Sequence, residues 1–499
     1  MNLQEKIQAL VHKAIESNLI EKEDEIYCTN QVMELFGLKD IEKKYTYDKE
    51  ETIPDILEEL MDFAVKCNII EDLSSEKDIL EAKVMNIFMS KPSEVIKNFY
   101  IEYNESPVKA TNYFYELSKN SNYIKTKSIA KNISYKVGTD YGDLDITINL
   151  SKPEKNPKDI AKAKEVKSTN YPKCLLCIEN EGYAGRINHP ARSNHRIIPV
   201  NLLDEKWYLQ YSPYSYYNEH CIVLCEEHRD MKIDKTMMRR LLEFIEKFPH
   251  YFIGSNADLP IVGGSILTHD HCQGGNYEFA MAKAGDDYGF ELNGFDDIKL
   301  SVVKWPMSVI RLRGKNVNSL VEASNYILDK WRGYSDEARG VLAFTDNTPH
   351  NTITPIARKK NNMYEMDLVL RNNRTSEEHP LGIFHPHEDV QHIKKENIGL
   401  IEVMGLAVLP ARLKTELKEV EKYILDEENS IAEYHVKWAD ELKAKYEKEI
   451  TAQTVSDIVK KETGYIFLRV LEDAGVFKRN EAGKAGFERF INYLNDRDI

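Results

Sequence analysis

The spacing of hydrophobic residues changes along this chain of 499 residues, and the change constrains the fold more than any single motif does. Over residues 1–130, apolar side chains recur every three or four positions, as from Leu3 to Ile15, which predicts amphipathic helices. From about residue 170 to 400, short β-branched and aromatic runs alternate with helical stretches. The sequence therefore predicts an α+β fold with antiparallel sheets, followed from about Ile393 to Ile499 by charged helices.

The same patterns predict individual elements. Helices are expected at Lys235–Lys247 and Lys437–Lys448, and a turn-rich stretch is expected around Ser151–Lys158. Strands are expected at Asp145–Leu150, His195–Val200, Glu219–Leu224, Ile261–Leu267, Ser301–Leu312, Gly340–Phe344, Thr352–Ala357 and Tyr364–Arg371.

Charge and cysteine content limit the function classes. The formal net charge of -15 argues against a nucleic-acid binder, whose surface would be basic, although a local group of cations can still hold a phosphorylated substrate. The chain has no stretch of roughly 18 or more apolar residues and starts without an apolar signal core, so we expect no membrane span and no secretion. Its seven cysteines, an odd number in a chain rich in lysine and glutamate, indicate reduced thiols and a cytoplasmic protein.

Two histidines and a glutamine alternate in the motif Thr268–Gln273, directly after the expected strand at Ile261–Leu267. In an extended strand, residues i, i+2 and i+4 share one face, roughly 6.5 Å apart at each step, so His269, His271 and Gln273 would point the same way. Two glycines follow and let the backbone approach a ligand. The motif fits a histidine nucleophile acting on a phosphate, a two-histidine metal site, or a purely structural run.

A Cys-x-x-Cys pair, Cys174 and Cys177, is typical of redox, structural or metal-binding sites. Tetrahedral zinc needs two further nitrogen or sulfur ligands, and His228 and His269 fit the order along the chain. Cys225 is an alternative ligand, or simply a small buried residue. If His269 binds the metal, the second histidine of its motif is held on a rigid element and faces the ligand pocket.

Together these residues resemble the galactose-1-phosphate uridylyltransferase family, and most closely its second branch, which is found in Gram-positive bacteria. The resemblance extends from about residue 85 to 410. It is carried by Ile148–Lys155, Tyr171–Tyr183, Tyr211–His220, His269–Gly275 and Gly382–His387. In the better-known branch the motif reads His-Pro-His-x-Gln and the helical N-terminal region has no counterpart; Asp270 replaces the proline here, as is usual in the second branch.

The resemblance implies a reaction and roles for individual residues. UMP would move from UDP-glucose to galactose 1-phosphate, a step of galactose metabolism, through a covalent uridylyl-histidine. His271 would be the nucleophile, and Gln273 would donate to a phosphoryl oxygen. One structural zinc ion would be held by four side chains: Cys174, Cys177, His228 and His269.

The resemblance also implies an architecture, a duplicated histidine-triad-like unit that is usually a homodimer. The two transferase halves would span residues 131–285 and 286–410. A mainly helical region would precede them over residues 1–130, and a helical tail would follow over residues 411–499.

Further residues are candidates for substrate binding. The family keeps an asparagine on the approach to the histidine motif, which corresponds to Asn256, and Ser265 would donate to a phosphate oxygen. Because the chain is acidic, phosphate binding needs local cations, of which we expect at least one of four lysines and arginines to line the pocket. The full candidate set is Asn256, Ser265, Gly274, Gly275, Lys152, Lys155, Arg311 and Arg313.

A second metal site is a further hypothesis. It would use His350, His385 and His387, with Glu278 as the nearest glutamate in sequence. A sugar-phosphate-binding role for His385 and His387 competes with this hypothesis.

Two other function classes remain open from the sequence. A histidine-triad hydrolase or phosphorylase would keep His271 but pass the nucleotide to water or phosphate. A non-catalytic zinc-binding module would use the Cys-x-x-Cys pair for stability alone.

Overall fold

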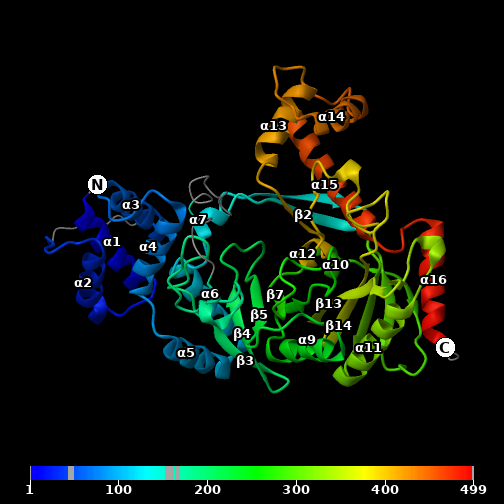
Figure 1. Ribbon diagram of the computed structural model, residues 1–499, viewed down its shortest axis with the longest axis horizontal. Helices are drawn as coiled ribbons and strands as arrows, with labels where there is room; N and C mark the ends of the chain where they lie inside the picture. The colour runs from blue at the N-terminus through cyan, green and yellow to red at the C-terminus, as the bar shows by residue number, and fades with distance from the viewer. Residues whose placement is uncertain (1, 43–49, 152–161, 163–168, 497–499) are drawn as a thin grey trace. The chain divides into compact units, whose positions relative to one another are not determined.

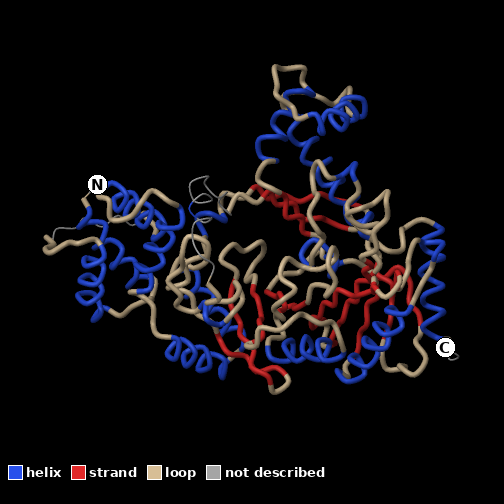
Figure 2. Tube along the Cα trace, in the orientation of Figure 1, coloured by secondary structure: helices blue, strands red, loops and turns tan. Residues whose placement is uncertain are grey.

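The computed structural model describes residues 2–42, 50–151, 162 and 169–496, which fall into two compact units (Figures 1 and 2). The first unit comprises Met1–Lys131, Ser151–Ser215 and Glu219–His228, and the second comprises Asn132–Leu150, Tyr216–Asn218 and Arg229–Ile499. The turn-rich stretch expected after Ser151 lies outside the described residues. The division of the chain at residues 130, 285 and 410 stays a prediction.

The first unit begins with helices, as the sequence predicts (blue in Figure 1). Helix α3 begins at Ile53 because Thr52 caps it: the Thr52 hydroxyl accepts from the Asp55 N–H, and the Asp55 carboxylate accepts from the Thr52 N–H. Fully buried side chains such as Ile7 and Leu60 form the core of this region. The helices are α1 (Leu3–Glu16), α2 (Glu25–Leu35), α3 (Ile53–Lys66), α4 (Ser74–Asn86), α5 (Pro92–Glu105), α6 (Pro107–Asn120) and α7 (Thr126–Ile129).

Three antiparallel strands complete the first unit. They are β3 (Ile198–Leu202), β4 (Glu205–Tyr211) and β5 (Cys221–Cys225), and each pairs with the next along the chain. Leu203 and Asp204, with φ of 53° and 60°, form the two-residue turn between β3 and β4, a geometry that matches the twist of paired strands. The predicted strands in this part therefore exist, although β3 and β5 both start later than expected.

The second unit contains a larger antiparallel sheet whose strands lie in the order β7-β6-β13-β14-β10-β9-β8. Helix α9 (Lys235–Lys247) has the bounds that the sequence predicts, because Asp234 caps its first turn and its apolar side is buried. Helices α9 and α11 (Val317–Gly333) pack together against β13 (Figure 1). The strands are β6 (Phe252–Gly254), β7 (His271–Gly275), β8 (Asp286–Phe290), β9 (Lys299–Val303), β10 (Val309–Gly314), β13 (Asn351–Lys360) and β14 (Met363–Asn372), and α10 (Ala280–Lys283) follows β7.

A smaller sheet in the second unit joins segments that are far apart in the sequence. β1 (Ile133–Thr139) and β2 (Gly142–Ile148) form a hairpin, and β15 (Leu406–Leu409) pairs with β2 in parallel, with Leu409 opposite Ile148. The short helix α12 (Leu400–Val403) precedes β15, and α15 (Val455–Ala474) packs against β1 and β2. The C-terminal helices are α13 (Leu413–Ile424), α14 (Glu433–Lys445), α15 (Val455–Ala474) and α16 (Glu481–Asn495), drawn in orange to red in Figure 1.

Three of the predicted strands do not form single strands in the structure. Ile261–Leu267 is not a strand but a series of turns with one isolated bridge, because Gly263 packs directly on the carbonyl groups of residues 257 and 259. Ser301–Leu312 is divided into β9 and β10, and Pro306 lies in the connection. Gly340 ends a 3-10 turn, and of the strand predicted at Gly340–Phe344 only Phe344 lies in a strand, the two-residue β11 (Phe344–Thr345), which pairs with β12 (Thr348–Pro349).

Candidate active site and metal centre

Strand β7 carries His271 and Gln273 on one face, two residues apart, as the alternation predicts. Its neighbour β6 fixes the register by pairing Gly254 with Gln273. His271 is buried, with 5% of its surface exposed, whereas Gln273 is half-buried. His269 does not belong to the strand, because it lies in a bend two residues before β7, so the predicted common face does not include it.

The ring of His271 has a defined orientation. Its Nδ1 lies 2.8 Å from the backbone carbonyl oxygen of His269, so Nδ1 carries the proton and donates it to that carbonyl. The other ring nitrogen, Nε2, then holds the lone pair and makes no hydrogen bond to another residue that the structure describes. Burial lowers the pKa of His271 to about 4, although the hydrogen bond to His269 opposes the shift. The imidazole is therefore neutral and nucleophilic at Nε2.

Asp270, which occupies the position between the two histidines, anchors the bend. Its N–H donates to the carbonyl of Arg229 at 2.7 Å, and its carboxylate lies 3.5 Å from the Arg229 guanidinium. Arg240 from α9 lies 4.0 Å from the same carboxylate. These contacts explain how an aspartate can fix the backbone where another sequence would use the rigid ring of proline.

The Cys-x-x-Cys pair and one histidine have metal-ligand spacing. The Sγ atoms of Cys174 and Cys177 are 3.5 Å apart, and Nδ1 of His228 lies 3.3 Å from the Cys177 Sγ. Ligand atoms at roughly 2.0 to 2.3 Å from a tetrahedral ion are separated by similar distances. With His269, these residues form a group that could hold a metal ion. Cys225, the alternative ligand, lies on β5 opposite Trp207 and is not part of this group.

Asn256 is buried directly after β6, and its side chain is held on both sides. Its Oδ1 accepts a hydrogen bond from the N–H of Leu400 at 2.9 Å. Gly264 and Gly399 pack on its amide so closely that a Cβ on Gly264 would lie 2.8 Å from Nδ2. Ser265, by contrast, is exposed on the turn that follows Gly264.

The two glycines at the end of β7 have different surroundings. The carbonyl of Gly274 accepts a hydrogen bond from the Tyr217 hydroxyl at 3.1 Å. Gly275 has a φ of 153°, which favours glycine at this position. The substrate contacts predicted for Gly274 and Gly275, as for Asn256 and Ser265, stay predictions.

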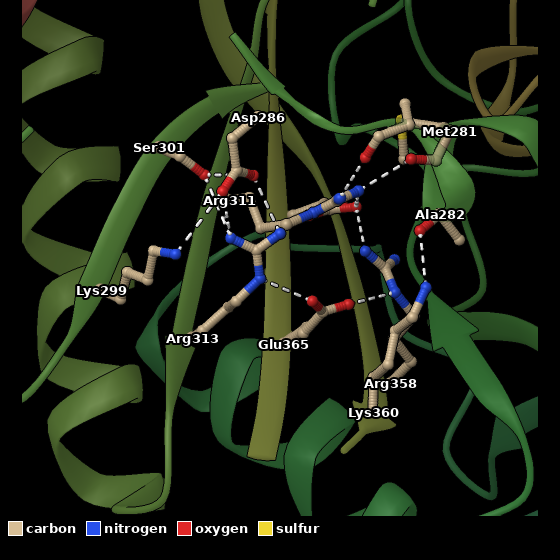
Figure 3. A network of polar contacts seen from close by, with 12 residues as sticks. Met281, Ala282, Asp286, Lys299, Ser301, Arg311, Arg313, Arg358, Lys360 and Glu365 are labelled. Carbon is tan, nitrogen blue, oxygen red and sulfur yellow. Dashed lines mark hydrogen bonds and ion pairs between the residues drawn. The ribbon is translucent and has the colours of Figure 1, made fainter. Parts of the chain in front are cut away.

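Of the four predicted phosphate-binding cations, Lys152 and Lys155 lie outside the described residues. Arg311 is fully buried and forms two hydrogen bonds to Asp367, at 2.6 and 2.9 Å, and others to the carbonyls of Met281 and Ala284. Arg313 is bound by Asp286 and Glu365 (Figure 3). These contacts favour a structural role for both arginines, and the prediction that one of the four cations lines a phosphate pocket stays untested.

The arginines belong to a chain of ion pairs in which cations and carboxylates alternate, buried at Asp367 and exposed at Asp286 (Figure 3). Arg358 from β13 donates to Glu365 at 2.8 Å and to Asp367 at 2.7 Å, so Asp367 is shared with Arg311. Burial alone would raise the pKa of Asp367, but the charges of Arg311 and Arg358 outweigh it and lower the pKa to about 2. The network ties β10, β13 and β14 together, and β6 lies between β13 and the strand that carries the candidate nucleophile.

The three histidines of the hypothetical second metal site have other partners. His350 contacts Asn373 and Thr345 through its two ring nitrogens, at 2.8 and 2.9 Å. His385 contacts Asn397, and His387 contacts the carbonyl of Ile383. Within the part of the chain that the structure describes, these histidines do not form a group with metal-ligand spacing. Glu278, the nearest glutamate in sequence, pairs with Lys360 at 2.9 Å.

Sequence reasoning did not select some cations that the fold brings near β7. A pocket of about 180 Å³ begins one residue after β7, and Arg358 and Lys360 line it together with Tyr277. Arg371 of β14 is buried beside the segment that holds Asn256. Arg358 and Arg371 lie in strands that the sequence pattern predicts to be apolar. The sequence could have indicated them only as charged residues within strands expected to be buried.

None of the helices within the described residues combines the length and apolar character that crossing a bilayer requires.

Comparison with known proteins places this chain in a class of nucleotidyltransferases. The profile of the galactose-1-phosphate uridyl transferase N-terminal domain matches residues 18–230, and that of the C-terminal domain matches residues 243–440. The galactose-1-phosphate uridylyltransferases of Clostridium perfringens strain 13 and Streptococcus mutans are each 54% identical to the chain. The first covers 99% of both chains, and the second covers 98% of this chain and 99% of its own. Among solved structures, yeast Ap4A phosphorylase Apa2 aligns with a TM-score of 0.31 and 14% identity over 60% of this chain and 88% of its own.

The chain belongs to the galactose-1-phosphate uridylyltransferase family. Galactose-1-phosphate uridylyltransferase activity, a nucleotidyl transfer in galactose metabolism, is therefore its function. The matched region includes most of the helical N-terminal region, which is thus shared with these relatives over nearly its full length.

Proposed function

We propose that the chain transfers UMP from UDP-glucose to galactose 1-phosphate by two successive displacements at His271. In the first, Nε2 attacks the α-phosphorus, an N–P bond forms, and the P–O bond to glucose 1-phosphate breaks, so that glucose 1-phosphate leaves with the electron pair. In the second, a phosphate oxygen of galactose 1-phosphate attacks the same phosphorus, the N–P bond breaks, and UDP-galactose forms. Two easier steps replace one difficult step, which is the usual advantage of covalent catalysis.

The observation that carries this proposal is the hydrogen bond from His271 Nδ1 to the His269 carbonyl. It directs the lone pair to Nε2, and it also supports the positive charge that the ring gains when Nε2 bonds to phosphorus. Gln273, on the same face of β7, supplies an amide donor for a non-bridging phosphoryl oxygen.

We further propose that zinc is the metal held by Cys174, Cys177, His228 and His269, since two thiols and two imidazoles suit this ion. When bound, the ion would act structurally and fix the bend that ends at His271. We also propose that the enzyme is cytoplasmic, as its cysteine content indicates, and a homodimer, as the family resemblance implies.

The test uses UDP-glucose labelled in its uridylyl group, without an acceptor. A transferase of this mechanism accumulates labelled protein and releases glucose 1-phosphate in equal amount. A histidine-triad hydrolase or phosphorylase would instead release free nucleotide continuously, and a zinc-binding module would do neither. Addition of galactose 1-phosphate should then discharge the label as UDP-galactose; label that stays on the protein would contradict the proposal.

A further inference from the structure

Arg371 is a buried cation that has no ion-pair partner among the described residues. Only 1% of its surface is exposed. Nη2 donates to the carbonyl of Ile398 at 2.8 Å, and Nη1 contacts the hydroxyl of Thr354 at 3.3 Å. Its Nε is buried without a hydrogen-bond partner in the part of the chain that the structure describes. This differs from Arg311, whose guanidinium is neutralised by a carboxylate.

The charge of Arg371 is only weakly balanced by its surroundings. Glu402 is the carboxylate that acts on it, but Glu402 already pairs with Lys394 at 3.2 Å. Burial lowers the pKa of Arg371 to about 10, which Glu402 only partly opposes. Burying a charge without a partner costs free energy, and residues in such an environment concentrate at functional sites.

The contact that Arg371 makes leads directly to Asn256. Arg371 holds the carbonyl of Ile398, and two residues later the N–H of Leu400 donates to Asn256 Oδ1 at 2.9 Å. The segment Ile398–Leu400 is therefore fixed at one end by Arg371 and at the other by Asn256. Because Oδ1 of Asn256 accepts this hydrogen bond, Oδ1 faces Leu400. The Nδ2 donor of the same amide therefore faces away from Leu400.

Asn256 is itself fixed relative to the candidate active site. It lies two residues after Gly254, which pairs with Gln273 on β7. A Cβ on Gly399 would lie 3.2 Å from the Asn256 Oδ1, and one on Gly264 would lie 2.8 Å from Nδ2, so the amide has little room to rotate. A shift of Ile398–Leu400 would therefore move Asn256.

We propose that Arg371 is a positioning residue for uridylyl transfer: through the carbonyl of Ile398 it holds the segment that orients Asn256 toward the phosphoryl group at His271. The inference rests on the proposed function and adds to it a residue that touches no substrate.

The test compares Arg371→Lys and Arg371→Met with Arg374→Lys and Arg374→Met. Arg374 is a matched control, because it also donates to a single backbone carbonyl, that of Gly340, but has no link to Asn256. We expect kcat of the Arg371 variants to fall about 10- to 100-fold, because a small misplacement of a group at the reacting centre is costly. KM for both substrates should stay within about twofold, since the displaced groups act on the transition state. The Arg374 variants should keep wild-type kcat.

A double-mutant cycle separates positioning from general stability. If Arg371 acts through Asn256, Arg371→Lys should reduce kcat strongly in the wild-type background and little in the Asn256→Ala background. Fully additive losses, or unchanged kcat in a folded Arg371→Lys variant, would overturn the inference. Because lysine keeps the charge and most of the volume, Arg371→Lys keeps the test informative even where Arg371→Met unfolds. Failure of the proposed function would look different: the wild-type enzyme itself would form no uridylyl adduct.

Discussion

The backbone carbonyl of His269 accepts a hydrogen bond from Nδ1 of His271 at 2.8 Å. One residue therefore serves two purposes, because its side chain belongs to the candidate metal group and its carbonyl sets the tautomer of the candidate nucleophile. If an ion binds this group, its removal should therefore disturb the candidate nucleophile through the backbone.

Replacing His271 with asparagine should abolish uridylyl transfer and leave the fold intact. Asparagine removes the attacking nitrogen but leaves all four candidate metal ligands in place. We expect kcat below about a thousandth of wild type, with metal content and melting temperature unchanged. His12→Asn on α1 is a control that removes a histidine outside the site, and it should keep full activity. Substantial transfer by the His271 variant would rule out the nucleophile assignment.

Cys174→Ser should lower metal content and thermal stability together, because ion binding to a folded site contributes folding free energy. Elemental analysis and thermal unfolding of the same preparation measure the two effects. Cys67→Ser, which replaces an exposed cysteine, should change neither. Wild-type protein purified without chelator and found to contain no metal would refute the metal centre.

Gln273→Ala should reduce kcat by about 100-fold, the usual effect of removing one preorganised donor from a transition state. The side chain is only half-buried, so the melting temperature should change little. Steady-state kinetics and the rate of labelling by UDP-glucose would both report the loss. An unchanged rate would show that Gln273 does not touch the phosphoryl group.

Asp367→Asn should destabilise the second unit by about 3 to 5 kcal/mol, because it leaves Arg311 and Arg358 buried without their shared carboxylate. Asp286→Asn, at the more exposed end of the same network, should cost about 1 kcal/mol or less. Urea unfolding monitored by circular dichroism compares the two variants. Equal effects would indicate that burial does not govern the strength of this network.

Acid should remove the contribution of Asp367 over a defined pH range. Its pKa is about 2 in the folded protein and near 4 in an unfolded chain, so the folded state favours the ionised form. The stabilisation is therefore fully present above about pH 4 and is lost as the pH falls from there towards 2. The difference in unfolding midpoint between wild type and Asp367→Asn should shrink over this range. A difference that stays constant from pH 7 to 3 would contradict the lowered pKa.

The sequence predicted best what depends on local pattern. Helix α9 has its predicted bounds because an N-cap and an apolar periodicity agree there, and the spacing of the Cys-x-x-Cys pair pointed to the metal group. The segment Ile261–Leu267 was predicted as a strand but forms turns. The close packing of Gly263 and Gly264 depends on contacts with the preceding loop, and a local sequence pattern does not reveal such contacts. The roles of Arg371 and of the His269 carbonyl depend on tertiary contacts, which no spacing in the sequence encodes.

The parallel pairing of β2 with β15 has a consequence for how the protein is made. Strand β2 ends at Ile148, and the strand that covers its open edge begins only at Leu406. A growing chain therefore presents an unpaired strand edge during the synthesis of all the residues between them, and such edges are sites of association with other chains. The nascent and C-terminally shortened forms are thus the ones most exposed to aggregation, and a stop codon ahead of β15 would release a chain that cannot complete this sheet.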